Sequence, residues 1–321
     1  MKTVPILDLH PHADDFEAEV RRGLSQPRKT LPTKFLYDRQ GSALFEQITE
    51  LPEYYPTRTE LAILRAYLPE IAALVGPEAL VLEFGSGSGL KTRLLLQHLD
   101  RPIAYVPVDI SRAALADSGQ ALSREFPGLE VLPVLADFSQ RLRLPMHSQE
   151  EQKRLVFFPG STIGNFTPDD AAHFLGRCSK LCGPGGGLLV GTDLQKSADI
   201  LEPAYDDAAG VTAAFNLNLL TRVNRELGGT FDLEAFTHRA IYDQEAGRIE
   251  MHLVSQKAQT VSLGEARYAF EEGESILTEY SHKYTLEGFA ALAARGGWAV
   301  KQVWTDPEQL FSVQYLEVPG A

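Results

Sequence analysis

A glycine-rich segment, Glu83–Gly89, offers the clearest chemistry in the sequence. It reads EFGSGSG and directly follows a short run of apolar, β-forming residues. Glycines at such a turn let the backbone bend sharply and approach a ligand, and amide groups at the start of a following helix can donate hydrogen bonds to it. A dinucleotide-binding fingerprint needs G-x-G-x-x-G, but Leu90 stands in place of the third glycine. The segment therefore predicts a nucleotide-like ligand and argues against a nicotinamide dehydrogenase.

Acidic residues at the ends of the next two predicted strands support such a ligand. Asp109 ends one strand, where a carboxylate can accept hydrogen bonds from both hydroxyls of a ribose. With Asp137-Phe138 after the next strand, the E-x-G-x-G-x-G turn resembles the first motif of class I methyltransferases that depend on S-adenosylmethionine (SAM). The resemblance implies SAM as the methyl donor, with Gly85 and Gly87 in the loop. In this class the acid and ring at Asp137-Phe138 bind adenine, through its exocyclic amine and its face.

Lys91 lies in the first turn of the helix that follows the glycine loop. A helix N-terminus disfavours a cation, because the helix dipole is positive there. A ligand carboxylate, such as that of the methionyl group of SAM, would explain this lysine. We therefore expect Lys91 to bind the cofactor.

The segment after the fourth predicted strand reads FPGSTIGNF over residues 158–166 and contains Asn165. In this enzyme class it lies nearest the reactive methyl group. An asparagine amide oxygen can accept a hydrogen from an amine and so orient its lone pair. Transfer to nitrogen needs a neutral amine in line with the S–CH₃ bond, at near-attack distance. The reaction needs neither a metal nor a covalent intermediate, and we expect no metal.

Longer blocks of sequence carry a more specific resemblance. They are Tyr37-Asp38, Gly41-Ser42, Leu51–Glu60, Gly160–Asn165, Ala204–Asn216 and Leu277–Ser281. Together they resemble the L-histidine Nα-methyltransferases of ergothioneine biosynthesis, which make hercynine (Nα,Nα,Nα-trimethylhistidine). The resemblance extends from about Leu24 to the C-terminus. It implies successive SN2 transfers from SAM to the α-amino group of histidine and of its mono- and dimethylated forms.

The resemblance also implies roles for individual residues. Tyr37, Asn165 and Tyr205 match positions that hold the α-amino and carboxylate groups of the substrate. Tyr37 and Asn165 are the candidate catalytic residues, and Tyr37 is a candidate proton relay, although a phenol with a pKa near 10 is a reluctant base.

A second set of matched residues encloses the imidazole ring. Tyr54, Glu279 and Ser281 match positions around the ring, and Met251 matches a wall beside it. Glu279 can accept from one ring N–H, while Ser281 can donate to or accept from the other nitrogen. His282 alternates with these residues along the strand, so we expect it to face the opposite side.

Other functions remain open at this stage. One is N-methylation of another aromatic amino acid or derivative, such as a tryptophan-like substrate. An indole needs at most one acceptor, whereas an imidazole uses both Glu279 and Ser281. Another is a SAM-binding protein without turnover, which would have no need of the acceptor residues.

The elements that must position these residues follow a regular rhythm in the middle of the chain. Buried β-rich runs alternate with helical patterns; the runs are Leu80–Phe84, Ile103–Asp109, Leu129–Val134, Arg154–Phe158 and Gly187–Thr192. This alternation predicts a doubly wound, parallel α/β sheet. We expect Trp298–Trp304 and Leu310–Leu316 to complete it.

The flanking segments break the rhythm. Residues 1–58 are mainly helical in pattern, as is the segment from Ile200 to about Arg239. Alternating β-formers then predict an antiparallel sheet; they lie at Arg248–Val254, Glu265–Phe270 and Ile276–Tyr284. The expected architecture is a Rossmann-like class I methyltransferase core with a second, smaller α+β substrate domain. The core would span 59–195 and 286–321, and the substrate-binding domain 1–58 and 196–285.

Composition limits the partners of the chain. Its 321 residues include 43 Asp and Glu against 30 Lys and Arg, a formal net charge of −13. This excess disfavours nucleic acid and an anionic membrane surface. The only cysteines, Cys178 and Cys182, provide no disulfide framework, and no signal peptide or membrane-spanning run is evident. We expect a cytoplasmic monomer that acts on a small molecule.

Overall fold

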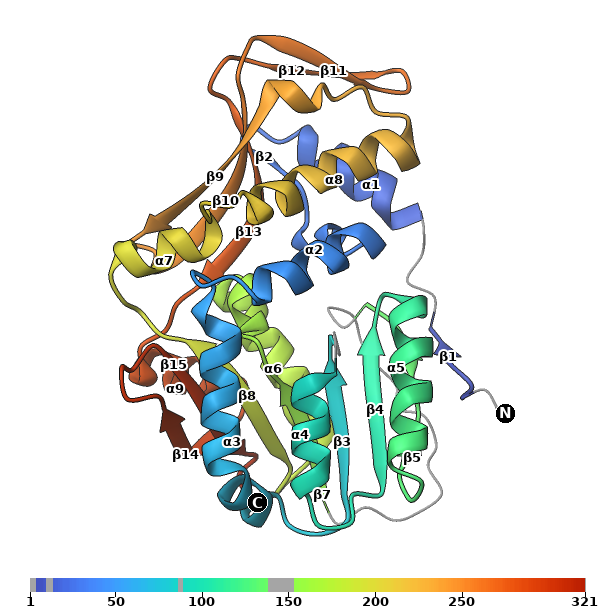
Figure 1. Cartoon of the computed structure of the whole chain (residues 1–321), viewed down its shortest axis with the longest axis vertical. Coiled ribbons are helices and arrows are strands. Elements are labelled where there is room, and N and C mark those ends of the chain that lie inside the picture. Colours follow the sequence, from blue (N-terminus) through green and yellow to red (C-terminus); the bar gives the residue numbers. More distant parts are fainter. Residues whose placement is uncertain (1–3, 10–13, 86–88, 138–152, 321) are drawn as a thin grey trace. The chain divides into compact units, whose positions relative to one another are not determined.

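The computed structural model describes residues 4–9, 14–85, 89–137 and 153–320, and these form two compact units (Figure 1). Unit 1 comprises Met1–Pro11, Pro56–Leu194 and Tyr284–Ala321. Unit 2 comprises His12–Tyr55 and Gln195–Lys283.

Unit 1 is built on a mixed sheet. Among the described residues the sheet has nine strands, in the order β1-β6-β4-β3-β7-β8-β15-β14, with β5 also paired to β4. The strands are β1 (Leu7–Asp8), β3 (Ala79–Phe84), β4 (Ala104–Asp109), β5 (Glu130–Val131), β6 (Val134–Leu135), β7 (Lys153–Phe158), β8 (Gly187–Asp193), β14 (Ala299–Thr305) and β15 (Phe311–Glu317). All neighbours are parallel except β8–β15 and β15–β14. The chain order reverses at β3, which lies between β4 and β7, so this is the Rossmann-like sheet that the sequence predicted.

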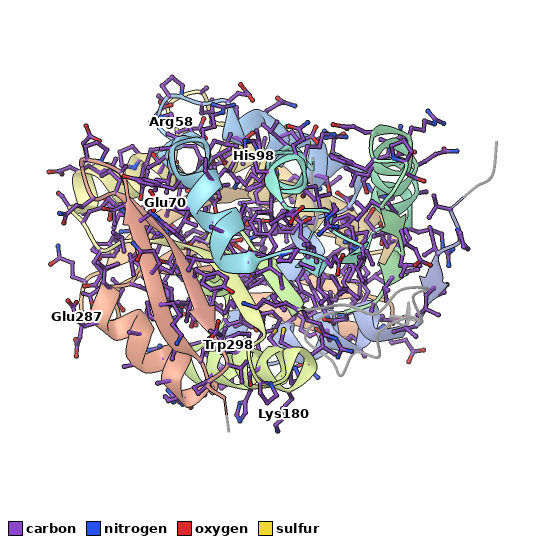
Figure 2. The ribbon with its side chains drawn as sticks, turned by 90° about the horizontal axis from the view of Figure 1, so that it is seen from below. Arg58, Glu70, His98, Lys180, Glu287 and Trp298 are labelled. Atoms are coloured by element: carbon purple, nitrogen blue, oxygen red, sulfur yellow. The ribbon has the colours of Figure 1, made fainter. Side chains whose placement is uncertain are left out.

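Helices cover both faces of this sheet. They are α3 (Tyr55–Val75), α4 (Leu90–His98), α5 (Arg112–Glu125), α6 (Pro168–Cys182) and α9 (Leu286–Arg295), with a short 3-10 turn, η2 (Thr162–Asn165). Alternate residues of β3 divide between two cores: Leu80 and Leu82 pack in the core with α6 and α9, and Val81 packs in the core with α3, α4 and α5. Trp298, labelled in Figure 2, directly precedes β14. Its indole donates to the carbonyl of Leu175 on α6 at 2.9 Å, which holds the start of β14 to this helix.

Unit 2 is an α+β unit. Its main sheet has the order β2-β13-β10-β9, and β11 pairs with β12 in a separate hairpin. The elements are α1 (Asp14–Leu24), β2 (Lys29–Thr30), η1 (Thr33–Leu36), α2 (Arg39–Thr49), α7 (Ala198–Tyr205), α8 (Val211–Leu227), η3 (Leu233–Ala235), β9 (Phe236–Asp243), β10 (Arg248–Ser255), β11 (Gln259–Leu263), β12 (Ala266–Phe270) and β13 (Ser275–His282). Helix α8 begins where the Asp207 carboxylate accepts from the amides of Val211 and Thr212, at 2.9 and 2.7 Å.

Three local expectations were wrong. The predicted helix to about Arg239 is too long, because strand β9 already begins at Phe236. This strand pairs with β10, and its first residues alternate between buried and accessible. The run at Glu265–Phe270 does not join the main sheet of unit 2 but pairs with β11. The run at Leu129–Val134 breaks into β5 and β6, because the intervening Pro133 cannot donate a ladder hydrogen bond.

The expected domain boundary also fails near the N-terminus. We placed residues 1–58 in the substrate-binding region, but β1 pairs in parallel with β6 of unit 1 through Leu7 and Asp8. Without β1, the strand β6 would present an open edge, and an extended segment can satisfy its backbone groups. The amide of Leu9 likewise donates to the carbonyl of Leu135 at 3.0 Å.

Candidate active site

The glycine loop begins where β3 ends, and its backbone explains two of its glycines. Gly85 has a φ of +74° and Gly89 a φ of +69°, values that favour glycine. The amide of Gly85 donates to the carbonyl of Val108 at 2.9 Å, and Gly89 immediately precedes α4. Gly87 lies outside the described residues, so its predicted contact with the cofactor stays a prediction.

The first residue of the loop motif, Glu83, has a supporting role that the sequence analysis did not assign. Its side chain is buried and accepts a hydrogen bond from Thr92 on α4 at 2.6 Å and another from the hydroxyl of Tyr105 on β4. Burial raises the pKa of Glu83 to about 7, although both hydrogen bonds oppose this rise. Glu83 thus links β3 to β4 and to α4 through hydrogen bonds, next to the start of the glycine turn.

The residues predicted to bind the ribose and the adenine lie at the ends of two neighbouring strands. Asp109 is the last residue of β4, and Asp137 follows β6 by two residues. These strands are adjacent and parallel, with Asp109 in register with Leu135. One Asp109 carboxylate oxygen accepts from the amide of Ser111 at 2.8 Å, which orients the group. Phe138 lies outside the described residues, and its stacking on adenine stays a prediction.

Lys91 has a partner within the chain. Its ammonium pairs with Glu60, a residue of α3 that is only 1% exposed. The same carboxylate accepts from the amide of Gly160 at 3.0 and 2.9 Å. This ion pair explains a lysine at the start of α4 without a ligand carboxylate, and it joins α3 and α4 to the loop that follows β7. Whether Lys91 also binds SAM remains a prediction.

Asn165 is the last residue of η2, in the same loop. The turn starts at Ser161, whose φ is +55° and whose hydroxyl accepts from the amide of Asp193 at 2.9 Å. The amide of Gly164 donates to the carbonyl of Ser161 at 2.8 Å and closes the turn. The loop is therefore held to the end of β8 as well as to Glu60, which limits the positions that Asn165 can take.

Three of the four predicted imidazole contacts share one face of the sheet in unit 2. Met251 on β10 pairs with Glu279 on β13, and Ile249 pairs with Ser281. An irregularity beside Met251 leaves Thr278 without a direct partner, and this extra residue brings Glu279 into phase with Leu253 and Ile276. Residues in direct register point to the same face, so Met251, Glu279 and Ser281 lie side by side there, as predicted.

Glu279 has an unsatisfied carboxylate oxygen on this face. It is 7% exposed, and its Oε2 has no hydrogen-bond partner among the described residues. Burial raises its pKa to about 7, and the positive charge of Lys283 opposes that rise. A buried carboxylate oxygen with no partner is costly, and a ligand that donates a hydrogen bond would relieve this cost.

Two hydroxyl-bearing side chains, Tyr205 and Ser281, contact a lysine near Glu279. Tyr205, the last residue of α7, lies 2.8 Å from the Ser281 hydroxyl. Lys283 donates to both hydroxyls, each at 2.8 Å. The ring of Tyr54 contacts the ring of Tyr205 edge to face, with centroids 6.1 Å apart. Tyr54, Tyr205 and Ser281 therefore lie together in unit 2, although we expected Tyr205 at the amino-acid end of the substrate and the other two around its ring. Lys283 was not predicted.

Tyr37 belongs to an aromatic cluster in the same unit. Its ring lies 5.5 Å from those of Phe45 and Phe215, centroid to centroid. Burial of its hydroxyl raises its pKa well above 10, and the charge of Glu279 adds to this. The next residue, Asp38, caps α2 and accepts from Asn218 at 2.8 Å, which fixes the backbone at Tyr37.

Comparison with known proteins identifies the enzyme class of this arrangement. The model of the family described as "Histidine-specific methyltransferase, SAM-dependent" matches residues 16–318. The chain belongs to this family. The match includes the cofactor-loop residues of unit 1 and every candidate imidazole contact of unit 2.

Individual relatives agree with this assignment. The chain is 46% identical to a histidine N-alpha-methyltransferase of Mycolicibacterium smegmatis, over 92% of each protein. It is 43% identical to a histidine N-alpha-methyltransferase of Mycobacterium tuberculosis, over 90% of each. It is also 32% identical to ergothioneine biosynthesis protein 1 of Neurospora crassa, where the match covers 87% of this chain and 32% of that longer protein.

In this histidine-specific methyltransferase the candidate residues divide between the two units. The cofactor candidates Gly85, Lys91, Asp109 and Asp137 belong to unit 1, as does Asn165. The substrate candidates belong to unit 2; they are Tyr37, Tyr54, Tyr205, Met251, Glu279 and Ser281. Glu60, Glu83 and Lys283 were missed, since buried acids and lysines carry no periodic signal that separates them from surface charges.

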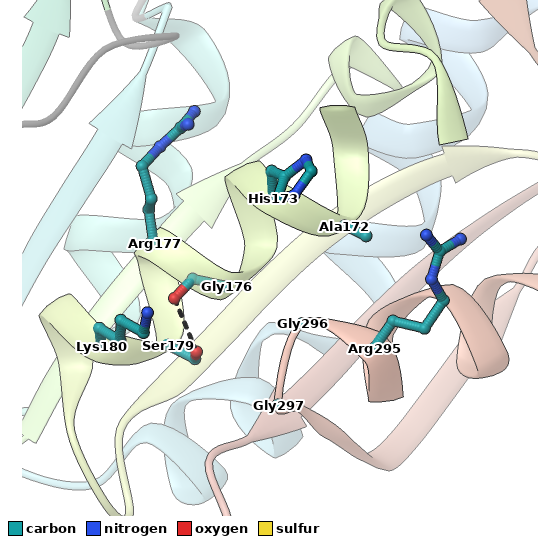
Figure 3. A pocket seen from close by; sticks show the side chains of 9 residues that line it. All are labelled: Ala172, His173, Gly176, Arg177, Ser179, Lys180, Arg295, Gly296 and Gly297. Atoms are coloured by element: carbon teal, nitrogen blue, oxygen red, sulfur yellow. Dashed lines mark hydrogen bonds between the residues drawn. The ribbon is translucent and has the colours of Figure 1, made fainter. Parts of the chain in front are cut away.

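A separate hollow lies on the outer side of unit 1. It has a volume of about 520 Å³ and is lined by α6 and the end of α9 (Figure 3). Its side chains are mainly basic, and they include His173, Arg177, Lys180 and Arg295. None of the candidate active-site residues lines it, and we assign it no part in methyl transfer.

Within residues 4–9, 14–85, 89–137 and 153–320, no group of three or more His, Cys, Asp or Glu residues could hold a metal ion. No helix in the described part of the chain has both the length and the apolar character to cross a membrane.

Proposed function

We propose that this chain is an L-histidine Nα-methyltransferase that converts histidine to hercynine by three successive transfers from SAM, the first step of ergothioneine biosynthesis. The observation that carries the proposal is the buried Glu279 carboxylate, with one oxygen lacking a partner, beside Ser281 and Met251 on one sheet face. This set suits a ring with polar atoms on two sides and a flat apolar surface. Family membership makes histidine the substrate that supplies such a ring.

Unit 1 has features that fit SAM. Gly85 adopts the left-handed conformation at the end of β3 and so lets the backbone approach a ligand. Asp109 can accept from the ribose hydroxyls and Asp137 from the adenine amine, since Asp109 ends β4 and Asp137 closely follows the end of the adjacent β6. When bound, SAM supplies an electrophilic methyl group on a positively charged sulfur.

The residues of this chain must then bind and orient the amine. We assign the α-amino and carboxylate groups to Tyr37, Asn165 and Tyr205. The Asn165 amide oxygen accepts a hydrogen from the amine, which directs the nitrogen lone pair toward the methyl carbon. Tyr37 keeps its proton at neutral pH because its pKa is well above 10. It therefore acts by hydrogen bonding, and the amine enters the reaction in its neutral form.

The aromatic residues of unit 2 suit the product. Each transfer leaves the nitrogen positively charged; the mono- and dimethylated forms must lose a proton before they react again, whereas the trimethylated nitrogen has none to lose and is a fixed cation. The electron-rich faces of tyrosine rings attract such cations. Tyr54 and Tyr205 present two such rings in mutual contact. We propose that they stabilise the later methylation states, which favours three transfers over one.

Mass spectrometry of histidine incubated with the enzyme and SAM tests the proposal. The expected product carries three added methyl groups on the α-nitrogen, with the ring unmodified. Parallel reactions with tryptophan and the other amino acids test for an alternative acceptor. Unmodified histidine together with methylated tryptophan would overturn the proposal. SAM binding with no turnover of any amino acid would instead indicate a non-catalytic protein.

We further propose that the enzyme is a cytoplasmic monomer that binds small molecules and no nucleic acid. Its net charge of −13 supports the last point, because nucleic-acid binding needs a positive surface. Cys178 and Cys182 are both free and buried, which suits a reducing compartment. Light scattering during gel filtration tests the oligomeric state.

A further inference from the structure

A buried lysine, Lys283, connects two of the predicted ligand-binding side chains. It is 2% exposed, and its ammonium donates to the hydroxyls of Tyr205 and Ser281, each at 2.8 Å. The two hydroxyl oxygens also lie 2.8 Å apart. Lys283, Tyr205 and Ser281 therefore form a closed triangle of hydrogen bonds within unit 2.

The chemistry of the three groups determines the direction of each bond. An ammonium group has three donors and no acceptor, so both hydroxyl oxygens accept from Lys283. Either hydroxyl could donate to the other; the phenol is the stronger acid and the better donor, and we take Tyr205 as the donor to Ser281. The Ser281 oxygen then accepts two hydrogen bonds, which uses both of its lone pairs. Its own hydrogen must point away from the triangle.

The surroundings of Ser281 indicate which ligand group its hydroxyl hydrogen can bind. Ser281 shares its sheet face with Glu279, two residues earlier and about 6.8 Å away along the strand. The Glu279 Oε2 has no partner among the described residues and can only accept when ionised. One donor and one acceptor thus lie side by side on the buried face, each able to bind one polar edge of a small ring.

We propose that Lys283 is a positioning residue that makes Ser281 an obligate donor, so that the site takes the neutral imidazole of histidine and excludes the imidazolium. The neutral ring has one N–H for Glu279 and one bare nitrogen for Ser281. The imidazolium has two N–H groups, and one of them would meet the Ser281 hydrogen. The inference rests on the proposed function, because it assumes that histidine is the substrate.

Other titratable groups near the triangle must be separated from this effect. They are the carboxylate of Glu279 on β13, the hydroxyls of Tyr37, Tyr54 and Tyr205, and His238 of β9, which contacts the Tyr205 carbonyl at 2.8 Å. The α-amino group of the substrate titrates as well. These groups act alike on two substrates that share an amino-acid end and whose neutral rings both offer an N–H to Glu279. A ratio of two substrates at each pH therefore cancels their contribution and leaves that of the ring.

The matched substrate is 3-(1,2,4-triazol-3-yl)alanine, whose ring has an N–H and a bare nitrogen but is a far weaker base than imidazole. We measure kcat/KM for histidine and for this analogue from pH 5.5 to pH 7.5. An imidazole of pKa about 6.5 is about one-tenth neutral at pH 5.5. For the natural sequence, the histidine-to-triazole ratio should fall about eightfold to tenfold from pH 7.5 to pH 5.5, since only neutral imidazole binds.

In Lys283→Met, Ser281 regains a lone pair and can accept from the imidazolium, so the ratio should change less than threefold over the same range. Lys283→Arg keeps a group that only donates and should restore the pH dependence. A ratio that is flat in the natural sequence overturns the proposal. So does a lysine variant that loses activity on both substrates but keeps the dependence, because that result indicates a purely structural lysine.

Should Lys283→Met fail to fold, Tyr205→Phe provides the second test. It removes the other donor to Ser281, frees the same lone pair, and should also flatten the ratio. An undiminished pH dependence in this variant contradicts the proposal. The proposed function is judged separately, by the trimethylation of histidine at pH 7.5 in the natural sequence. Failure of that reaction leaves no histidine rate and is recognised before any ratio is formed.

Discussion

Replacement of Glu279 by glutamine should stabilise the unliganded protein while it weakens histidine binding. The pKa of this carboxyl is about 7 in the folded chain against an ordinary value of 4.5, because burial penalises the ionised form. The pKa of Glu279 thus rises by about 2.5 on folding. This rise corresponds to a free energy of about 3 kcal/mol, at about 1.4 kcal/mol for each pKa unit. Relaxation of the surroundings makes this an upper estimate.

The sign of the pH dependence follows from the raised pKa. Below about pH 4.5 the carboxyl is protonated in both folded and unfolded chains, and Glu279 imposes no ionisation cost. As the pH rises from 4.5 through 7, the unfolded chain ionises first, and the cost to the folded state grows to its full value. Glu279→Gln should therefore raise the free energy of unfolding by up to about 3 kcal/mol at pH 8 and far less at pH 5.

Two assays measure the two effects. Urea unfolding of the unliganded protein at pH 5 and pH 8 gives the stability difference. Steady-state kinetics at pH 8 should show a histidine KM about 30-fold to 150-fold higher in Glu279→Gln, which corresponds to 2–3 kcal/mol for a lost charged hydrogen bond. The affinity for SAM should change little, since the cofactor candidates belong to unit 1.

Glu250→Gln is the matched control. Glu250 lies on β10 in register with Tyr280, out of phase with Met251, and its carboxylate pairs with Arg248 at 2.6 Å. Loss of this partly exposed pair should lower stability by less than about 1 kcal/mol and leave the histidine KM unchanged. Equal behaviour of the two variants would refute the reasoning. So would a Glu279→Gln protein that is less stable at pH 8 than at pH 5 relative to the natural sequence.

Three further predictions concern other residues. Asp109→Ala should weaken SAM binding by about 1–2 kcal/mol, measured by calorimetry, with the histidine KM nearly unchanged; an equal loss for both ligands would contradict its ribose role. Gly191→Ala should destabilise the protein by about 2 kcal/mol or more in thermal unfolding, because a Cβ there would overlap the Glu60 carboxylate; unchanged stability would contradict that contact. Tyr37→Phe should lower kcat without altering the shape of the pH–rate profile up to pH 9, since the pKa of Tyr37 lies well above 10; loss of an alkaline limb would show that Tyr37 titrates.

The parts of the fold that could be predicted are those with a strong local signal. Strands β3, β4, β7 and β8 correspond to buried apolar runs, and the closing pair β14 and β15 was also expected. Buried parallel strands are continuously apolar, so each is recognisable alone. The strand β9 was missed because its start, Phe236–Arg239, follows a long helical pattern and has few apolar residues. Its extended form depends on pairing with β10, which lies later in the chain.

The candidate site shows the same limit. Glycines, strand-end acids and family blocks identified most candidate residues. They did not identify Glu60, which lies 31 positions from its partner Lys91 and 100 positions from the Gly160 amide that it also binds. Such contacts exist only once β3, β7 and their helices are assembled. The bulge beside Met251 is similar: alternation alone places Glu279 and Ser281 on one face of β13 and Ile276 on the other, whereas the bulge brings all three to the same face.

Glu279 and Lys283 together show why an unfavourable arrangement can persist in a folded site. Each is almost fully buried, and the lysine, whose ammonium donates to two hydroxyls, lowers the cost of ionising the nearby carboxyl without pairing its Oε2. A direct pair on that oxygen would stabilise the unliganded protein but would remove the acceptor that a ring N–H requires. The lysine instead donates to one lone pair of Ser281 and leaves the buried Glu279 oxygen able to accept from a ligand. Glu279→Gln should therefore raise the free energy of unfolding and weaken histidine binding. The two changes together would measure how much stability this residue costs the protein in return for substrate recognition.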